Sequence, residues 1–461
     1  MSDKLKIVIV FTIMAYNLTV SSMFLSHERA NKSAAYYEAS TQSRQPSFSE
    51  STIFECPQKP LSYEELEFTQ PFDHFDSNDN RTFKQRYRIQ RHYFEPTVNA
   101  QKIILLIGGE SPIAINEICL ETYPHMKIAA ETKSLYLTSD FALADLKNFI
   151  ENFNNMNNFT APKTVAIGGS YPGTLAARMR LLHPNHVVGS ISSSAPLTPV
   201  LNFTNYSKAV ELVIRALRPD CAIAIRTAFV DLLTKLKTEV GRSELVKIFR
   251  FHPDLNPKEL SIIDMNTITT GIYDEFIDIV QNYKDDGRLS GACDLLTSNE
   301  TNSLKKLSAF YDSVSNNNPI ITSFEQSISS LIPTNYSTDT SGGQHDPDTR
   351  AWLFMLCNEL GWFQPSSPNG MFQDAAPLSY YMNVCDRLFD IDKEEYEKRI
   401  SRSQKNYGRL DDFNATNVLF IHNAYDPWIT LGFKVQIARN HLLSQTIPGK
   451  LTTTPVAYYV L

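Results

Sequence analysis

The sequence predicts an α/β fold in which a mostly parallel sheet carries a large, mainly helical insertion. Residues 163–192 alternate a short apolar run, a glycine-serine turn, a helical period and a second apolar run. Continuous apolar runs at residues 102–107 and 418–422 end in polar loops, as buried parallel strands do. Between these strands, residues 201–385 show helical periods with few strand-like runs. We therefore expect a sheet interrupted by a helical cap.

The N-terminal segment has the pattern of a secretory leader. In residues 1–22, Lys4 and Lys6 precede an apolar run at residues 7–15, and small residues follow. This pattern predicts a signal peptide, with an uncleaved membrane anchor as the alternative. Residues 23–60 lack an apolar period and are predicted to be a mobile leader. No later run is long and apolar enough for a membrane span, so none is expected after signal cleavage.

Further features of the composition agree with a mature protein in an oxidising compartment. The net charge of −7 gives no basic surface for nucleic acid. Six widely spaced cysteines without a C-x-x-C pair favour disulfides over zinc. The sequence has no H-E-x-x-H, G-x-G-x-x-G or Walker pattern, so neither a metal nor a nucleotide cofactor is expected. Glycosylation acceptor triplets begin at Asn80, Asn158, Asn202, Asn205, Asn299, Asn335 and Asn414.

The first predicted strands leave a gap in the sheet. Residues 68–75 and 83–93 alternate polar and apolar side chains around a turn-prone stretch, as an antiparallel pair does. Residues 102–107 form the first predicted parallel strand. Two helical periods follow, at residues 117–133 and 138–154, with only four residues between them. Helices that cross over a sheet are normally separated by a strand, so one central strand is expected to be missing.

The turn through Gly168, Gly169 and Ser170 has the pattern of a nucleophile elbow. A serine on a tight strand-to-helix turn presents its hydroxyl at the carboxyl edge of the sheet. Pro172 stands where the usual motif has glycine, but proline suits the first turn of a helix and leaves the amide of Tyr171 as an oxyanion donor. The alternative is an ordinary glycine turn of an α/β protein. We predict that Ser170 is the nucleophile.

The acid that would serve this serine is predicted at Asp426. It follows the apolar run at residues 418–422, and in hydrolases the acid comes after the nucleophile on a loop behind a late strand. An Asp-Pro turn without a catalytic role is the alternative.

Six segments resemble the S28 family of serine peptidases, whose members include lysosomal prolyl carboxypeptidase, dipeptidyl peptidase II and thymus-specific serine protease. They occur in order across most of residues 65–430 and are therefore more specific than the elbow alone. The segments are FTQPFDHFDSNDNRTFKQRY, ILLIGGESPI, SDFALADLKNFI, GGSYPGTLAARMRLLHP, RAWLFMLCNELGWFQ and NVLFIHNAYDPW.

The resemblance implies an α/β-hydrolase sheet with a helical cap and a Ser-Asp-His triad that contains Ser170 and Asp426. It implies oxyanion donors at Tyr171 and in the loop of Gly109 and Glu110. It also implies peptide substrates with proline beside the scissile bond, and secretion or lysosomal delivery. The implied disulfides are Cys357 with Cys385 and Cys221 with Cys293.

Two parts of the family pattern are missing. The family histidine follows an Ile-Pro-Gly-like strand end, but here the chain continues from residues 447–449 to Leu461 without a histidine. The only histidine after Asp426 is His441, in a helical run at residues 433–443, where we predict a solvent-facing position and a weak candidate base. The family also has a strand and an E-H-R-Y-Y-G-like segment near Lys133 that this chain lacks. An altered transcript or gene model explains both gaps at once, whereas evolution to an inactive homologue explains the missing histidine better than the missing strand.

These observations predict a serine exopeptidase that acts on proline-containing peptides through an acyl-enzyme on Ser170. A catalytically inactive homologue that binds peptides or a protein partner is the alternative. An esterase or lipase is disfavoured by the peptidase-like segments outside the elbow. The predicted domains are the sheet in two parts, residues 61–200 and 386–461, and the cap at residues 201–385. The sequence does not decide whether peptides are trimmed from the carboxyl or the amino end, or whether the chain forms a homodimer.

Overall fold

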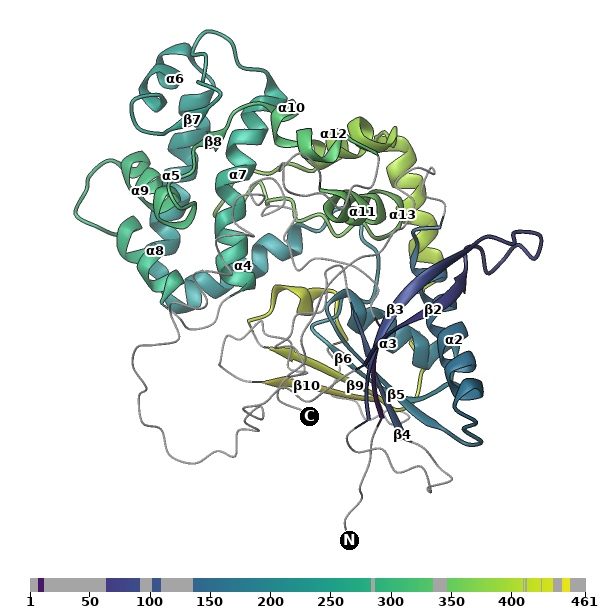
Figure 1. Ribbon diagram of the computed structural model, residues 1–461. Coiled ribbons are helices and arrows are strands. Elements are labelled where there is room, and N and C mark those ends of the chain that lie inside the picture. Colours follow the sequence, from purple (N-terminus) through teal and green to yellow (C-terminus); the bar gives the residue numbers. More distant parts are fainter. Residues whose placement is uncertain are drawn as a thin grey trace.

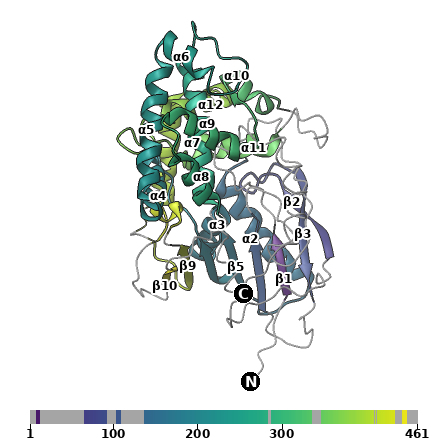
Figure 2. The same ribbon diagram turned by 90° about the vertical axis from the view of Figure 1, so that its left-hand side faces the viewer.

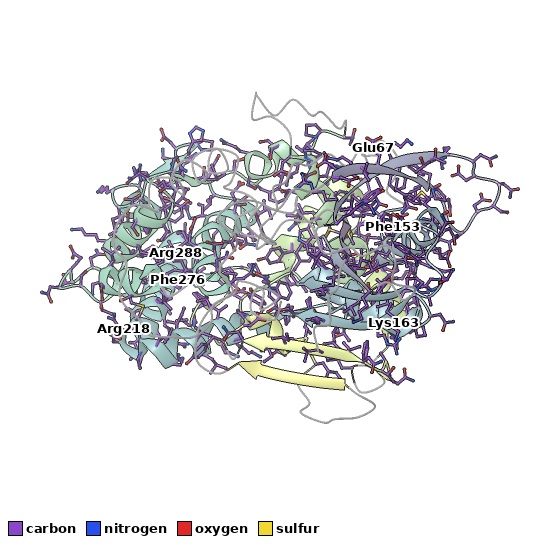
Figure 3. All side chains as sticks on the ribbon, turned by 60° about the horizontal axis from the view of Figure 1, so that its bottom comes forward. Glu67, Phe153, Lys163, Arg218, Phe276 and Arg288 are labelled. Carbon is purple, nitrogen blue, oxygen red and sulfur yellow. A yellow bond between two sulfur atoms is a disulfide. The ribbon has the colours of Figure 1, made fainter. Side chains whose placement is uncertain are left out.

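A sheet at one end of the molecule and a group of helices at the other make up the fold (Figures 1 and 2). In Figure 3, Phe276 and Arg218 lie among these helices, whereas Lys163 lies at the sheet and Phe153 lies on a helix beside it. The computed structural model describes residues 7–11, 64–91, 102–108, 136–282, 287–334, 346–408, 410, 413–423, 425–433 and 442–447. For residues 7–11 and 442–447 it describes the backbone alone.

Among the described residues, eight strands form the large sheet in the spatial order β10-β9-β6-β5-β4-β1-β3-β2. The neighbours from β10 to β1 pair in parallel, whereas β1 with β3 and β3 with β2 pair antiparallel. The strands are β1 Ile7–Phe11, β2 Glu64–Pro71, β3 Thr82–Gln90, β4 Lys102–Ile107, β5 Lys163–Gly169, β6 Val187–Ser193, β9 Val418–Asn423 and β10 Leu442–Ile447.

The predicted strand, bend, helix and strand of residues 163–192 match β5, α3 (Tyr171–Leu182) and β6. The predicted antiparallel pair corresponds to β2, which begins four residues earlier than expected, and to β3, which begins one residue earlier. The predicted helix at residues 138–154 corresponds to α2 (Ser139–Met156), and the one at 117–133 lies outside the described residues. The mostly parallel α/β architecture predicted from the sequence is therefore present.

The predicted helical run at residues 433–443 was wrong at its end. Leu442 begins β10, which pairs in parallel with β9 from Leu442 opposite Val418 to Ile447 opposite Asn423. A strand at the edge of a sheet forms because of its pairing with the neighbouring strand more than because of its own periodicity. The helical pattern of residues 433–443 therefore gave the wrong structure for the last two residues.

In the described part of the sheet, β1 lies between β3 and β4. Residues 136–138 lead directly into α2 without a strand. Ile7 pairs with Ile103 of β4, and Phe11 pairs with both Ile107 of β4 and Tyr87 of β3. The strand thus comes from the stretch in which the sequence predicts a signal peptide. A cleaved leader and a strand of the sheet exclude each other for the same molecule.

The helices between β6 and β9 form the part that stands away from the sheet in Figures 1 and 2. The expected cap boundary at residue 385 falls inside α12, and the helical region continues to the end of α13. These helices are α4 Thr204–Leu217, α5 Pro219–Leu236, α6 Glu239–Leu245, α7 Ile262–Gln281, α8 Arg288–Leu296, α9 Ser303–Val314, α10 Phe324–Ser327, α11 Pro347–Met355, α12 Leu378–Phe389 and α13 Lys393–Tyr407. A two-residue strand pair, β7 (Phe251–His252) and β8 (Ile320–Ile321), lies among them.

Two disulfides tie the helical part together. They join Cys221 of α5 to Cys293 of α8, and Cys357 to Cys385 of α12, which are the pairs that the family resemblance implied. None of the helices among the described residues has the length and apolar character needed to cross a membrane.

Candidate active site

Ser170 stands on a strained bend between β5 and α3. Its backbone has φ 58° and ψ −132°, a conformation that non-glycine residues rarely adopt and that costs about 1–3 kcal/mol. A Cβ on Gly168 would lie 2.2 Å from the carbonyl oxygen of Pro172, and one on Gly173 would lie 2.9 Å from the Cβ of Ala195. These two glycines let the helix start against the strand, which leaves the Ser170 side chain partly exposed.

The start of α3 is held in place by hydrogen bonds to β6 and the loop after it. The hydroxyl of Ser192 donates 2.9 Å to the carbonyl of Gly173, and the hydroxyl of Thr174 donates 2.6 Å to the carbonyl of Pro196. Pro172 stands in the first turn, where a missing N–H costs nothing. The departure from the usual elbow motif is therefore compatible with the same geometry.

Tyr171, whose amide is the predicted oxyanion donor, has a buried side chain. Its hydroxyl lies 3.0 Å from the hydroxyl of Ser139, and its ring packs 5.6 Å from Trp352 and 6.3 Å from Trp362. This packing fixes the residue at the positive end of the α3 dipole, where a developing negative charge is stabilised. The other predicted donors, Gly109 and Glu110, lie outside the described residues.

Asp426 lies at the same edge of the sheet as Ser170. The amide of Ser170 donates 2.8 Å to the carbonyl of Ser193 in β6, and the amide of Ser194 donates 2.8 Å to the carbonyl of Ile421 in β9. Asp426 comes five residues after Ile421, past the end of β9. Two inter-strand spacings therefore separate the serine and the acid, about 10 Å between their backbones.

Asp426 is 3% exposed, and only one of its two carboxyl oxygens accepts a hydrogen bond from the described residues. Oδ1 accepts a 2.9 Å hydrogen bond from the amide of Trp428, whereas Oδ2 accepts none from the described residues. Burial raises the pKa of Asp426 to about 6, although the hydroxyl of Ser194 and the amide of Trp428 act to lower it. A buried acceptor without a donor costs about 1–3 kcal/mol, so this oxygen is suited to a donor from outside the described residues.

The candidate base His441 lies outside the described residues. The next residue, Leu442, pairs with Val418 at the amino end of β9, about 17 Å along the strand from the edge that carries Asp426. The chain reaches that edge only at Ile447, opposite Asn423, and no histidine follows in the sequence. The role of His441 as a weak candidate base therefore stays a prediction.

Sequence reasoning missed His422 and Glu359. His422 is fully buried in β9, and a Cβ on Gly432 would lie 2.2 Å from its ring. Glu359 is also buried; its Oε2 accepts 2.9 Å from the amide of Ser139 and its Oε1 accepts 2.8 Å from the hydroxyl of Tyr407. The quoted segments contained both residues, but nothing in the sequence predicted their buried positions.

The comparison with known families decides between the chemistries that an elbow can support. The family described as serine carboxypeptidase S28 matches residues 70–135 and 129–452 of this chain. The chain belongs to the S28 family of serine peptidases. As an S28 chain it is a hydrolase of the serine peptidase type, and peptides are the substrates that the family implies.

Relatives of this S28 chain cover most of its length. A candidate serine protease of Caenorhabditis elegans is 30% identical over 425 residues, which are 83% of this chain and 77% of the relative. The mouse lysosomal Pro-X carboxypeptidase is 24% identical over 417 residues, 81% of this chain and 80% of the relative. The mouse thymus-specific serine protease is 23% identical over 405 residues, 78% and 76% of the two chains.

The family match divides in two at an informative place. The two matched pieces meet at residues 129–135, directly before α2, where the sequence predicts that a strand is missing. Among the described residues, β1 lies between β4 and β3 in the sheet. Within the described parts of the chain, no group of three His, Cys, Asp or Glu side chains could hold a metal ion.

Proposed function

We propose that this S28 chain is a secreted or lysosomal serine exopeptidase that cleaves peptides beside proline. The observation that carries the proposal is Ser170 on a strained elbow, two strands from the buried carboxyl of Asp426 at the same sheet edge. The strained backbone of Ser170 and the buried carboxyl of Asp426 both destabilise the fold. Roles as a nucleophile and its acid explain why the protein keeps both.

In the proposed reaction, the Ser170 hydroxyl attacks the peptide carbonyl while a base removes its proton. The amide of Tyr171 and the dipole of α3 stabilise the oxyanion. The amine leaves with that proton, and water then hydrolyses the acyl ester on Ser170. Asp426 would orient the base through Oδ2, the oxygen that has no donor among the described residues.

Proline preference is supported by the aromatic residues beside the acid. Trp428 is partly exposed two residues after Asp426, and its ring lies 5.8 Å from Phe203 and 5.0 Å from Tyr206. A flat aromatic face held in this way suits a pyrrolidine ring. The mouse relative named lysosomal Pro-X carboxypeptidase points to the same substrate class.

Delivery to the secretory pathway is supported by the predicted leader, the two disulfides and the glycosylation acceptors. Six of the seven predicted acceptor asparagines lie among the described residues, and all six are exposed: Asn80, Asn158, Asn202, Asn205, Asn299 and Asn414. Asn335 lies outside them. A homodimer stays a prediction.

A second candidate function is a catalytically inactive homologue that binds peptides. It is favoured by Oδ2 of Asp426, which accepts no hydrogen bond from the described residues. Loss of the base leaves only the rate supplied by the oxyanion site and binding, roughly 10³–10⁴ over water.

One experiment separates the two functions. The purified full chain and its Ser170→Ala variant are treated with a fluorophosphonate probe and with a proline-containing reporter peptide. Slow, Ser170-dependent labelling and hydrolysis support a peptidase. Peptide binding that is unchanged in Ser170→Ala, with no labelling of the full chain, supports the binding protein instead.

A further inference from the structure

The first residues of α2 and α3 are joined by a hydrogen bond between their side chains. The hydroxyl of Ser139 lies 3.0 Å from the hydroxyl of Tyr171, and both residues are fully buried. Neither helix receives a side-chain hydrogen bond from its own N-cap residue, Thr138 or Ser170. The first amides of each helix therefore depend on partners from elsewhere in the molecule or from a ligand.

Glu359 is such a partner for α2. Its Oε2 accepts a 2.9 Å hydrogen bond from the amide of Ser139, and its Oε1 accepts 2.8 Å from the hydroxyl of Tyr407. Burial raises the pKa of Glu359, whereas the amide of Ser139, the hydroxyl of Tyr407 and the hydroxyl of Ser139 act to lower it. Because the charged carboxyl only accepts hydrogen bonds, the Ser139 hydroxyl donates to it and its oxygen accepts from the Tyr171 hydroxyl.

The same carboxyl also reaches α3 through Tyr407. The guanidinium carbon of Arg178 lies 3.9 Å from the centre of the Tyr407 ring. Arg178 comes seven residues after Tyr171, which is about two helical turns, so both lie on the same face of α3. Contacts at two turns of one face fix both the position and the rotation of a helix. Glu359 is connected to α3 at each of them.

The backbone that carries Glu359 is itself held against the sheet. Glu359 lies in a π-helical turn, η4 (Leu356–Leu360), which follows α11. The amide of Val200, in the loop after β6, donates 3.1 Å to the carbonyl of Leu360. Gly361 has φ 69° and leaves no room for a Cβ against the carbonyl of Val200. Turns of this type are rare and often lie at functional sites, which suits a residue with a role in the elbow.

We propose that Glu359 is a positioning residue for the oxyanion site. Through Ser139 it fixes the side chain of Tyr171, and it thereby holds the amide of Tyr171 where the oxyanion forms when Ser170 attacks the peptide carbonyl. An oxyanion donor must lie about 2.7–3.1 Å from that oxygen, so a small shift of Tyr171 lowers the rate. The inference rests on the proposed function, because it concerns a donor of the same reaction.

The test measures kcat and KM for the proline-containing reporter peptide and the rate of Ser170 labelling by the fluorophosphonate probe. Tyr171→Phe and Ser139→Ala each remove one hydroxyl of the link and keep the backbone amide. We expect each to lower kcat and the labelling rate about tenfold with KM unchanged, less than the roughly 10²–10³ that loss of a whole oxyanion donor costs. Because both changes break the same link, the double variant should be no slower than either single variant.

Glu359→Gln and Glu359→Ala test the carboxyl itself. Glutamine keeps an oxygen that accepts from the amide of Ser139, and its own amide group donates to the oxygen of Tyr407. We therefore expect Glu359→Gln to keep nearly all of kcat and Glu359→Ala to lose about as much as Tyr171→Phe. Tyr396→Phe is the control, because it removes a buried hydroxyl that donates 3.0 Å to the carbonyl of Leu201; it should lose stability without a change in kcat.

The outcomes separate this inference from the proposed function. An unchanged kcat in Tyr171→Phe, or losses that add in the double variant, would overturn the role of Glu359, while Ser170-dependent labelling would leave the peptidase assignment standing. Absence of labelling in the unaltered chain would overturn both. Circular dichroism confirms that each variant is folded; if Glu359→Ala is not, the two hydroxyl variants decide the test.

Discussion

The amide of Ser170 donates a 2.8 Å hydrogen bond to the carbonyl of Ser193, which fastens the elbow to the strand that separates it from the acid. β6 pairs with β5 on one side and with β9 on the other, so the serine and Asp426 keep a fixed separation. Changes at the elbow and at the acid can therefore be tested separately.

Gly168→Ala should destroy the elbow. Its Cβ would lie 2.2 Å from the carbonyl oxygen of Pro172, and relief requires movement of the start of α3. We expect the free energy of unfolding to fall by about 1–3 kcal/mol and fluorophosphonate labelling of Ser170 to be lost. Gly271→Ala is the matched control, because no atom lies within 4 Å of the new Cβ and alanine favours the interior of α7. Undiminished labelling in Gly168→Ala would contradict the geometry.

Asp426 should make stability depend on pH. Burial raises its pKa from 3.8 to about 6, so the folded protein retains a proton that the unfolded chain releases as pH rises. Its contribution to stability is full below about pH 4 and is lost by about pH 6, a loss of roughly 3 kcal/mol. Asp426→Asn should flatten this part of the curve in urea unfolding measured from pH 4 to pH 7.

Asp348 provides the matched control for this titration. Burial and the neighbouring Asp346 raise its pKa to about 6 as well, but it lies at the start of α11 and not at the elbow. Asp348→Asn should also flatten the curve while leaving Ser170 labelling intact. A curve that Asp426→Asn leaves unchanged would show that this carboxyl is not held protonated by burial.

The elbow could be predicted from the sequence because its determinants are local. Gly168, Ser170 and Pro172 specify one bend, and the flanking apolar runs specify the strands that carry it. The position of β10 could not be predicted in this way, because Leu442 takes a strand conformation through its pairing with Val418. Local sequence carries no information about such a partner.

The same limit applies to the buried polar groups and to β1. The amide of Ser139 donates to Glu359, which is 220 residues away in the chain, so no local sequence pattern predicts this hydrogen bond. Residues 7–15 are apolar enough for a leader and for a buried strand, and only the pairing of residues 7–11 with β3 and β4 distinguishes the two uses.

Tyr407→Phe should destabilise the buried contacts of Glu359 with Tyr407 and Ser139. The change removes the hydroxyl that donates 2.8 Å to Oε1 of the buried Glu359, whose pKa burial already raises. It keeps the ring that lies 3.9 Å from the guanidinium of Arg178. We expect a loss of about 1–3 kcal/mol in urea unfolding, because a buried carboxyl loses a donor.

Tyr396→Phe is the comparison for that change. Its hydroxyl donates 3.0 Å to the carbonyl of Leu201, a neutral acceptor, so the expected loss is smaller, about 0.5–1.5 kcal/mol. If the two variants lose the same stability, the carboxyl of Glu359 has no special dependence on Tyr407.

Removal of residues 1–22 should weaken the centre of the sheet. β1 supplies ladder partners to β4 on one side and to β3 on the other, and without it both strands expose backbone groups inside the sheet. We expect the free energy of unfolding to fall by at least about 3 kcal/mol, measured by urea unfolding of the full and shortened chains. In the full chain, Val10→Pro should reproduce part of the loss, because proline removes a ladder donor, whereas Ser33→Pro in the predicted leader should not. N-terminal sequencing of protein secreted from cells shows which form exists: a product that begins after Ser22 and is as stable as the full chain would contradict a structural role for β1.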